Sequence, residues 1–135
     1  MKKAALGIPA LLLVIALFLF GCGKVPGVHN TGTSGPAVAQ TTVQMGSTTF
    51  VQSTRSIKAG DTLTFDDTVG GGGLHIICLG KDQVCDKAAT GPAAVMDPGF
   101  TINPGATKAV VFPTAGTYQI TCTVHPNMNL VVTVS

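Results

Sequence analysis

The sequence contains no glutamate and no tryptophan, and only 10% of its 135 residues are charged. Long amphipathic helices usually carry Glu, Lys and Leu with a period of 3.6 residues, and no such pattern occurs after residue 22. Threonine, valine, alanine and glycine dominate instead. Valine and threonine favour strands, whereas glycine and proline favour turns. The composition therefore excludes a mainly helical protein and indicates short strands joined by tight turns.

The sequence also lacks an excess of basic residues. Eight Lys and Arg residues stand against six acidic ones, all of them Asp, and two of the basic residues are Lys2 and Lys3. Without that terminus, six basic and six acidic residues remain. A nucleic-acid-binding protein would present a basic face, so we expect no nucleic-acid partner. We also find no nucleophile with a neighbouring base and no paired acid and base, and we therefore expect no enzyme.

The first 21 residues have the pattern of a secretory signal peptide. Lys2 and Lys3 precede an apolar run from residue 4 to residue 20, and Gly21 and Cys22 follow it. The Gly-Cys junction resembles the lipobox of bacterial lipoproteins, in which the cysteine becomes the lipidated first residue of the mature chain. This resemblance implies lipid on Cys22 and a location on the outer side of the cytoplasmic membrane. The alternative is an uncleaved transmembrane anchor, because a run of about 17 residues is at the short limit for spanning a bilayer.

Past the signal, we predict a flexible tether over residues 22–40 and one domain over residues 41–135. The tether is rich in Gly, Ser, Thr and Pro, and its lone His29 is expected to be solvated rather than to bind a ligand. The domain alternates strand-like runs with turn residues at spacings near ten residues, which predicts an all-β sandwich of seven or eight strands. The predicted strands cover residues 41–45, 48–52, 62–65, 75–79, 100–102, 106–112, 117–123 and 130–134. Asp66, Asp67 and Gly70–Gly73 are assigned to a loop.

The chemistry is concentrated near the end of the chain. Cys122, His125 and Met128 are separated by two residues each, so a tight loop can direct a thiolate, an imidazole and a thioether at one point. A second imidazole would complete a His2Cys set with a weak axial Met, which is the ligand set of a blue-copper site. His75, where a loop enters a strand, is the natural fourth ligand. Met96 is the main competitor for the axial position.

These residues give the segment a family resemblance. The pattern Cys122-x2-His125-Pro-x-Met128 resembles the short ligand loop of amicyanin-type cupredoxins. Residues 57–65 and 115–118 resemble cupredoxin segments that precede the ligands. The resemblance covers most of residues 41–135 and implies a Greek-key sandwich, one type 1 copper ion and a role as an electron carrier. It also implies redox-protein partners and an exit for the electron at His125, within an apolar patch to which Leu74, Pro98 and Pro126 can contribute. We expect a monomer.

One position departs from the family pattern. Many cupredoxins follow the first ligand histidine with Asn or Asp, which ties the two ligand loops together, whereas Ile76 follows His75. The outer shell of the site must therefore differ. Of the remaining cysteines, Cys78 and Cys85 are expected to form a disulfide in an oxidising compartment. A metal-binding Cys pair is the alternative.

Two other functions stay open at this point. An extracytoplasmic copper-delivery protein would use the same four ligands and exchange the ion quickly. A metal-free sandwich that binds a protein partner would develop no colour with copper.

Overall fold

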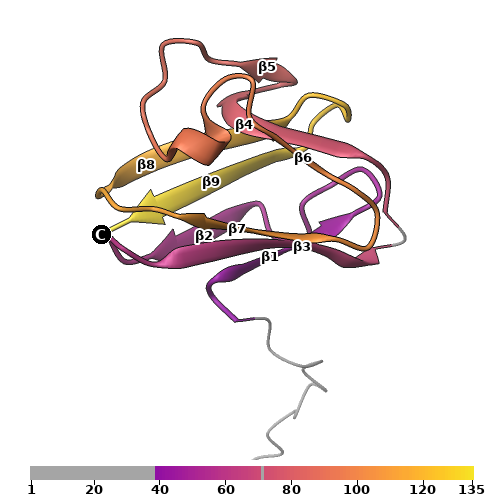
Figure 1. Ribbon diagram of the computed structural model, residues 1–135, viewed down its shortest axis with the longest axis horizontal. Coiled ribbons are helices and arrows are strands. Elements are labelled where there is room, and N and C mark those ends of the chain that lie inside the picture. Colours follow the sequence, from indigo (N-terminus) through magenta and orange to yellow (C-terminus); the bar gives the residue numbers. More distant parts are fainter. Residues whose placement is uncertain (1–38, 71) are drawn as a thin grey trace, which may run out of the picture. The chain divides into compact units, whose positions relative to one another are not determined.

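The computed structural model describes residues 39–70 and 72–135, which form a sandwich of two β-sheets (Figure 1). A single turn of 3-10 helix, η1, covers Ala93–Val95. The strands in chain order are β1 (Thr42–Gly46), β2 (Thr54–Ile57), β3 (Thr62–Gly70), β4 (His75–Lys81), β5 (Val84–Cys85), β6 (Phe100–Ile102), β7 (Thr107–Val111), β8 (Gly116–Cys122) and β9 (Asn129–Val134). The all-β sandwich predicted from the sequence is confirmed.

The two sheets differ in size. The smaller has the order β1-β3-β7, and the larger has the order β2-β9-β8-β4-β5, with β6 paired to β4. The pairs β1–β3 and β2–β9 are parallel, and the other ladders are antiparallel. In Figure 1, β4, β8 and β9 lie in one layer, and β1, β3 and β7 lie in the other. The adjacent antiparallel strands β4 and β8 form the part of the larger sheet from which the candidate site is built.

The core lies between the sheets and follows from the alternation of side chains along each strand. In β8, Tyr118, Ile120 and Cys122 point inward, and their polar neighbours Thr117 and Gln119 point outward. The strand β9 buries Leu130, Val132 and Val134 in the same way. Aromatic rings fill the space between the sheets: Phe65 contacts Phe50 and Phe100, with ring centroids 6.3 and 5.4 Å apart.

Two segments differ from the sequence prediction. Residues 48–52 do not form a strand, because only Phe50 pairs, in an isolated bridge to Met45, while the chain crosses between the sheets. The next strand is β2, which begins at Thr54. The strand β3 also continues through Asp66 and Asp67 to Gly70, where a loop was expected. Pairing with both β1 and β7 keeps this stretch extended, although its residues are typical of turns.

The signal peptide and nearly all of the tether lie outside the residues that the structure describes, and so does Cys22. Within residues 39–70 and 72–135, no helix is long and apolar enough to cross a membrane.

Candidate metal centre

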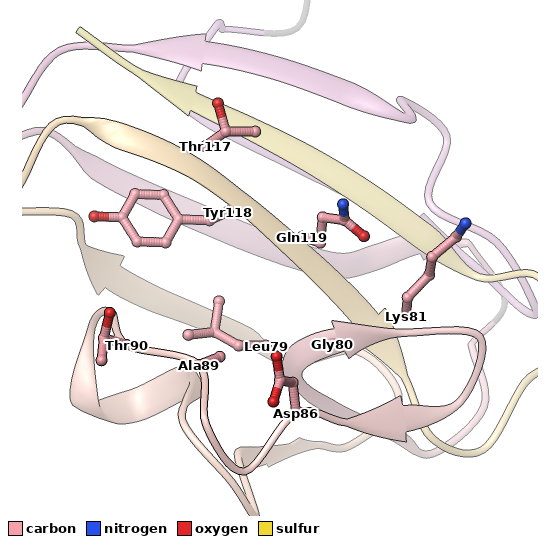
Figure 2. Close-up of a pocket in the computed structure, with 9 residues that line it drawn as sticks. All are labelled: Leu79, Gly80, Lys81, Asp86, Ala89, Thr90, Thr117, Tyr118 and Gln119. Carbon is pink, nitrogen blue, oxygen red and sulfur yellow. The ribbon is translucent and has the colours of Figure 1, made fainter.

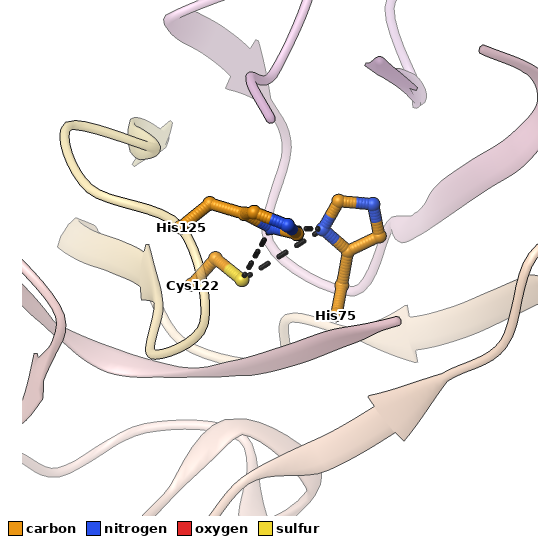
Figure 3. Close-up of side chains that lie close together, drawn as sticks. All are labelled: His75, Cys122 and His125. Atoms are coloured by element: carbon orange, nitrogen blue, oxygen red, sulfur yellow. Dashed lines mark hydrogen bonds between the residues drawn. The ribbon is translucent and has the colours of Figure 1, made fainter. Parts of the chain in front are cut away.

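Three potential metal ligands converge at one end of the sandwich (Figure 3). The Cys122 Sγ atom lies 3.7 Å from His75 Nδ1 and 3.6 Å from His125 Nδ1, and the two Nδ1 atoms are 3.2 Å apart. A point equidistant from these three atoms lies about 2 Å from each, which is close to the length of a metal–nitrogen bond in proteins. The three side chains therefore fit around one metal ion.

The sheet explains how these residues meet. His75 is the first residue of β4 and Cys122 is the last residue of β8, and these strands pair with Ile77 opposite Cys122. Alternation places His75 on the same face of β4 as Ile77, so both His75 and Cys122 point into the sandwich. The loop between β8 and β9 then turns back and brings His125 over them. Each ligand is thus positioned by a strand end or by the tight loop next to it.

The two histidines differ in how deeply they are buried. The side chains of His75 and Cys122 are fully buried, whereas His125 is partly exposed. Burial lowers the pKa of His75, and the neighbouring His125 lowers it further, while the Asp67 carboxylate acts in the opposite direction. A lowered pKa favours the neutral imidazole, which has the free lone pair that a metal ligand needs. Two imidazoles and a thiol are the donor types that copper prefers in trigonal electron-transfer sites.

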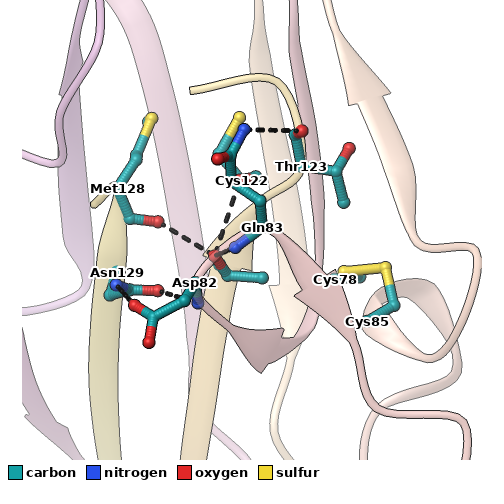
Figure 4. Close-up of a disulfide and its surroundings, with 9 residues drawn as sticks. Cys78, Asp82, Gln83, Cys85, Cys122, Thr123, Met128 and Asn129 are labelled. Carbon is teal, nitrogen blue, oxygen red and sulfur yellow. Dashed lines mark hydrogen bonds between the residues drawn. A yellow bond between two sulfur atoms is a disulfide. The ribbon is translucent and has the colours of Figure 1, made fainter. Parts of the chain in front are cut away.

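The expected axial residue, Met128, lies directly before β9 and is 1% exposed. Its backbone oxygen accepts a hydrogen bond of 3.0 Å from the Cys122 backbone N–H, so the two residues lie side by side. Figure 4 shows their sulfur atoms at the same end of the neighbouring strands. The competitor Met96 is 38% exposed at the end of η1, and Met45 is buried in β1.

A disulfide joins Cys78 to Cys85, and Cys122 is the free cysteine among residues 39–70 and 72–135 (Figure 4). Cys78 pairs with Thr121 of β8, the residue before Cys122. The disulfide closes the hairpin of β4 and β5, whose two-residue turn consists of Asp82 and Gln83. The hairpin therefore lies beside the segment that carries three of the expected ligands.

The turn of this hairpin is hydrogen-bonded to the ligand loop. The Gln83 backbone N–H donates to Thr121 Oγ1 at 3.1 Å, and the Gln83 side chain donates to the Thr123 carbonyl at 3.2 Å. Asp82 accepts a 2.7 Å hydrogen bond from the Asn129 amide, and its backbone N–H donates to the Asn129 Oδ1. These four bonds connect the hairpin to Thr121 and Asn129, on the two sides of the Cys122–Met128 loop, and to Thr123 within it.

Backbone and Gln83 hydrogen bonds connect the two ligand segments in this chain, where Ile76 follows His75. The Ile76 side chain cannot make the tie that Asn or Asp makes at this position in many cupredoxins. In this chain, the Ile76 carbonyl accepts a 2.9 Å hydrogen bond from the Thr123 backbone N–H. The Gln83 side chain donates a hydrogen bond to the Thr123 carbonyl. Thr123 is thus held from two directions, and the contacts of Gln83, 40 positions away, could not be read from local sequence.

A further residue near the site was assigned to a loop in the sequence analysis. Asp67 is 1% exposed, and its Oδ1 lies 3.7 Å from His75 Nε2. Leu63, Phe65 and Asp67 alternate on the buried face of β3. That period of two was the available signal, but the adjacent aspartates and glycines suggested a turn. The site therefore contains a buried carboxylate that the sequence analysis missed.

A surface pocket lies away from the ligand candidates. A cavity of about 400 Å³ is lined by residues of β4, β8 and the segment after β5, among them Leu79, Thr90 and Tyr118 (Figure 2). None of the metal-ligand candidates lines it. The ligand candidates instead lie inside the end of the sandwich, where the protein itself encloses the metal position.

Comparison with known proteins agrees with this geometry. Residues 37–135 match the model of the copper-binding proteins of the plastocyanin/azurin family. Solved structures of amicyanin share the fold. A reduced amicyanin variant is 22% identical over 70% of this chain and 80% of its own, with a TM-score of 0.52, and a copper(I) form of a methionine variant has the same values. Amicyanin from Paracoccus versutus (Thiobacillus versutus) is 22% identical over 70% of this chain and 79% of its own, with a TM-score of 0.49.

No curated protein sequence matches the chain significantly. The family match covers nearly all of the described residues, and the donor set within it suits copper. The chain therefore belongs to the plastocyanin/azurin family of copper-binding proteins, and its cofactor is one type 1 copper ion.

Proposed function

We propose that this protein is a membrane-tethered blue-copper electron carrier with His75, Cys122 and His125 as its trigonal ligands and Met128 as the weak axial ligand. The observation that carries the proposal is the convergence of the three ligand atoms, all within 4.8 Å of one another. Bound copper supplies the redox chemistry by accepting and releasing one electron between its Cu(II) and Cu(I) states.

The protein's contribution is to hold the ligands still. His75 and Cys122 are fixed at the ends of paired strands, and the loop after Cys122 is tied to the hairpin of β4 and β5. Ligands that cannot move keep the same geometry in both oxidation states, so little rearrangement accompanies electron transfer. The Cys122 thiolate gives covalency to the copper bond, and the Met128 thioether tunes the potential as a weak donor.

The partly exposed ring of His125 is the proposed exit for the electron. Exposed apolar residues lie near it: Val124 and Pro126 flank His125 in sequence, and Leu74 follows Gly73, which lies against the His125 ring. Pro98 is also exposed, but the next residue, Gly99, lies against Ile77 and Cys78 farther along β4. An uncharged apolar surface of this kind suits brief docking of a redox protein. The electron donor and acceptor are therefore expected to be proteins.

The tether and the location belong to the same proposal. The signal pattern and Gly21-Cys22 support a lipid anchor on the outer side of the cytoplasmic membrane. The disulfide between Cys78 and Cys85 supports an oxidising compartment. Replacing Cys22 with Ala in the full-length chain should release the protein from the membrane fraction or block its processing. Membrane retention with an uncleaved amino terminus would show a transmembrane anchor instead.

Voltammetry combined with a copper-exchange assay tests the electron-carrier role. The copper-loaded domain of residues 39–135 should show a reversible one-electron couple and should retain its ion for hours in the presence of a competing chelator. A domain that loses copper within seconds and shows no reversible couple would be a delivery protein, and the electron-carrier proposal would fail.

A further inference from the structure

A buried carboxylate stands behind the ligand histidine that the protein encloses. Both carboxylate oxygens of Asp67 and the Nε2 atom of His75 are buried, and none of the three has a hydrogen-bond partner. They are three of the four such side-chain atoms in residues 39–70 and 72–135. Oδ1 of Asp67 lies 3.7 Å from Nε2 of His75, slightly longer than a hydrogen bond. Buried polar groups are nearly always paired, so two that face each other point to a shared role.

The two nitrogens of the His75 ring point in different directions. Nδ1 faces Cys122 and His125, and Figure 3 shows the second nitrogen on the side away from them. A ligand histidine that binds a metal through Nδ1 carries its hydrogen on Nε2 and donates it to an outer partner. Asp67 is the acceptor that the structure places within reach of this hydrogen.

The position of Asp67 is built into the fold. Its backbone N–H donates to the Ala106 carbonyl at 3.0 Å, which holds β3 extended at this residue. Gly72 lies against the carboxylate, because a Cβ atom there would overlap the Asp67 carboxylate oxygens. A side chain at residue 72 would therefore displace the carboxylate, which gives this glycine a specific purpose beside the site.

We infer that Asp67 is a positioning residue of the copper centre: its carboxylate accepts the Nε2 hydrogen of His75, fixes the ring with Nδ1 toward the metal, and lowers the reduction potential. This inference rests on the proposed ligand set. A negative charge enclosed near the ion stabilises Cu(II) more than Cu(I), because the interaction grows with the charge of the ion and is weakly screened inside the protein.

Replacing Asp67 with Asn removes the charge and nearly preserves the shape. Loss of an outer-shell partner typically weakens metal binding by 10–100-fold. If Asp67→Asn weakens Cu(II) binding about tenfold more than Cu(I) binding, the reduction potential rises by about 59 mV. The thiolate-to-copper band should persist, because the ligands are unchanged. A role in folding alone would leave the potential of the copper-loaded protein unaltered.

Asp66→Asn is the matched control. Asp66 precedes Asp67 in β3 and carries the same charge, but it is not buried and accepts its hydrogen bonds from Thr68. Its replacement should change the potential much less. Equal shifts in reduction potential for Asp66→Asn and Asp67→Asn would overturn the inference, and so would no shift for Asp67→Asn. In either case, a reversible couple in the wild-type domain would still support the proposed function. A wild-type domain with neither a thiolate band nor a couple would overturn both.

A second measurement needs no variant and covers the case in which Asp67→Asn does not fold. Nitrogen-15 NMR of the diamagnetic Cu(I) protein should show a protonated Nε2 on His75, with a hydrogen that exchanges with solvent far more slowly than the corresponding hydrogen of His125. An unprotonated His75 Nε2, or exchange as fast as at His125, would overturn the inference.

Discussion

The two segments that carry the ligands are held in opposite ways. The start of β4 places His75 by burial, with the Asp67 carboxylate behind it and Gly72 against that carboxylate. The segment from Cys122 to Met128 is held by hydrogen bonds from a disulfide-closed hairpin. The first arrangement encloses the ligand and controls the charge around it. The second leaves one ligand, His125, at the surface and controls the shape of the loop.

The difference between the enclosed and the exposed histidine should have its largest effect when each histidine is removed in turn. His125→Gly opens a gap at the surface, so added imidazole should enter, restore the missing ligand and recover the thiolate-to-copper band. His75→Gly leaves a gap that is closed to solvent, and imidazole should not restore the band. The measurement is visible absorption of both variants with Cu(II), with and without imidazole. Equal recovery in the two variants would show that the difference in burial has no consequence for access.

The disulfide should contribute the largest stabilising effect on the loop side. In the chain-entropy model, a crosslink that closes a loop of this length stabilises the folded state by about 2.5 kcal/mol. The double variant Cys78→Ala/Cys85→Ala should therefore lose about that much free energy of unfolding in a urea titration of the copper-free domain. The wild-type domain with its disulfide reduced serves as the control and should agree with the double variant. A loss near zero would mean that the hydrogen bonds alone hold the hairpin.

The enclosed histidine, His75, should make the free energy of unfolding depend on pH. The pKa of His75 in the folded, copper-free domain is lowered from 6.5, mainly by burial. The unfolded chain then binds more protons than the folded one below about pH 6.5, so the free energy of unfolding should fall as the pH falls from there toward the folded pKa. Urea titrations between pH 7 and pH 5 measure this slope. His75→Gln should flatten it, and an unchanged slope in that variant would assign the effect to another group.

The smallest change in stability is expected from the loss of one hydrogen bond between the β4–β5 hairpin and the ligand loop. Gln83→Ala removes the hydrogen bond to the Thr123 carbonyl and leaves the backbone bond to Thr121 in place. The domain should lose about 1 kcal/mol of stability. Gln119→Ala, on the exposed face of β8, is the control and should change stability by less than about 0.5 kcal/mol. Equal losses for the two variants would remove Gln83 from the account of the loop.

The sequence alone was sufficient to predict the sandwich and the convergence of the metal ligands. Alternating strands predicted the sheets, and the short spacing from Cys122 to His125 required the two side chains to lie close together. Asp67 was missed because adjacent aspartates and glycines favour turns, and only pairing with two neighbouring strands keeps them extended. The bonds of Asp82 and Gln83 were missed because they join residues 38 to 47 positions apart. Tertiary contacts of that range leave no local periodicity to read.

The visible absorption spectrum of the domain with stoichiometric Cu(II) tests the central claim most directly. If His75, Cys122 and His125 hold the copper, the wild-type domain should show an intense thiolate-to-copper band, and Cys122→Ser should abolish it because the serine oxygen cannot supply that transition. A wild-type domain that binds one equivalent of Cu(II) without the band, or a Cys122→Ser variant that retains the band, would contradict the account.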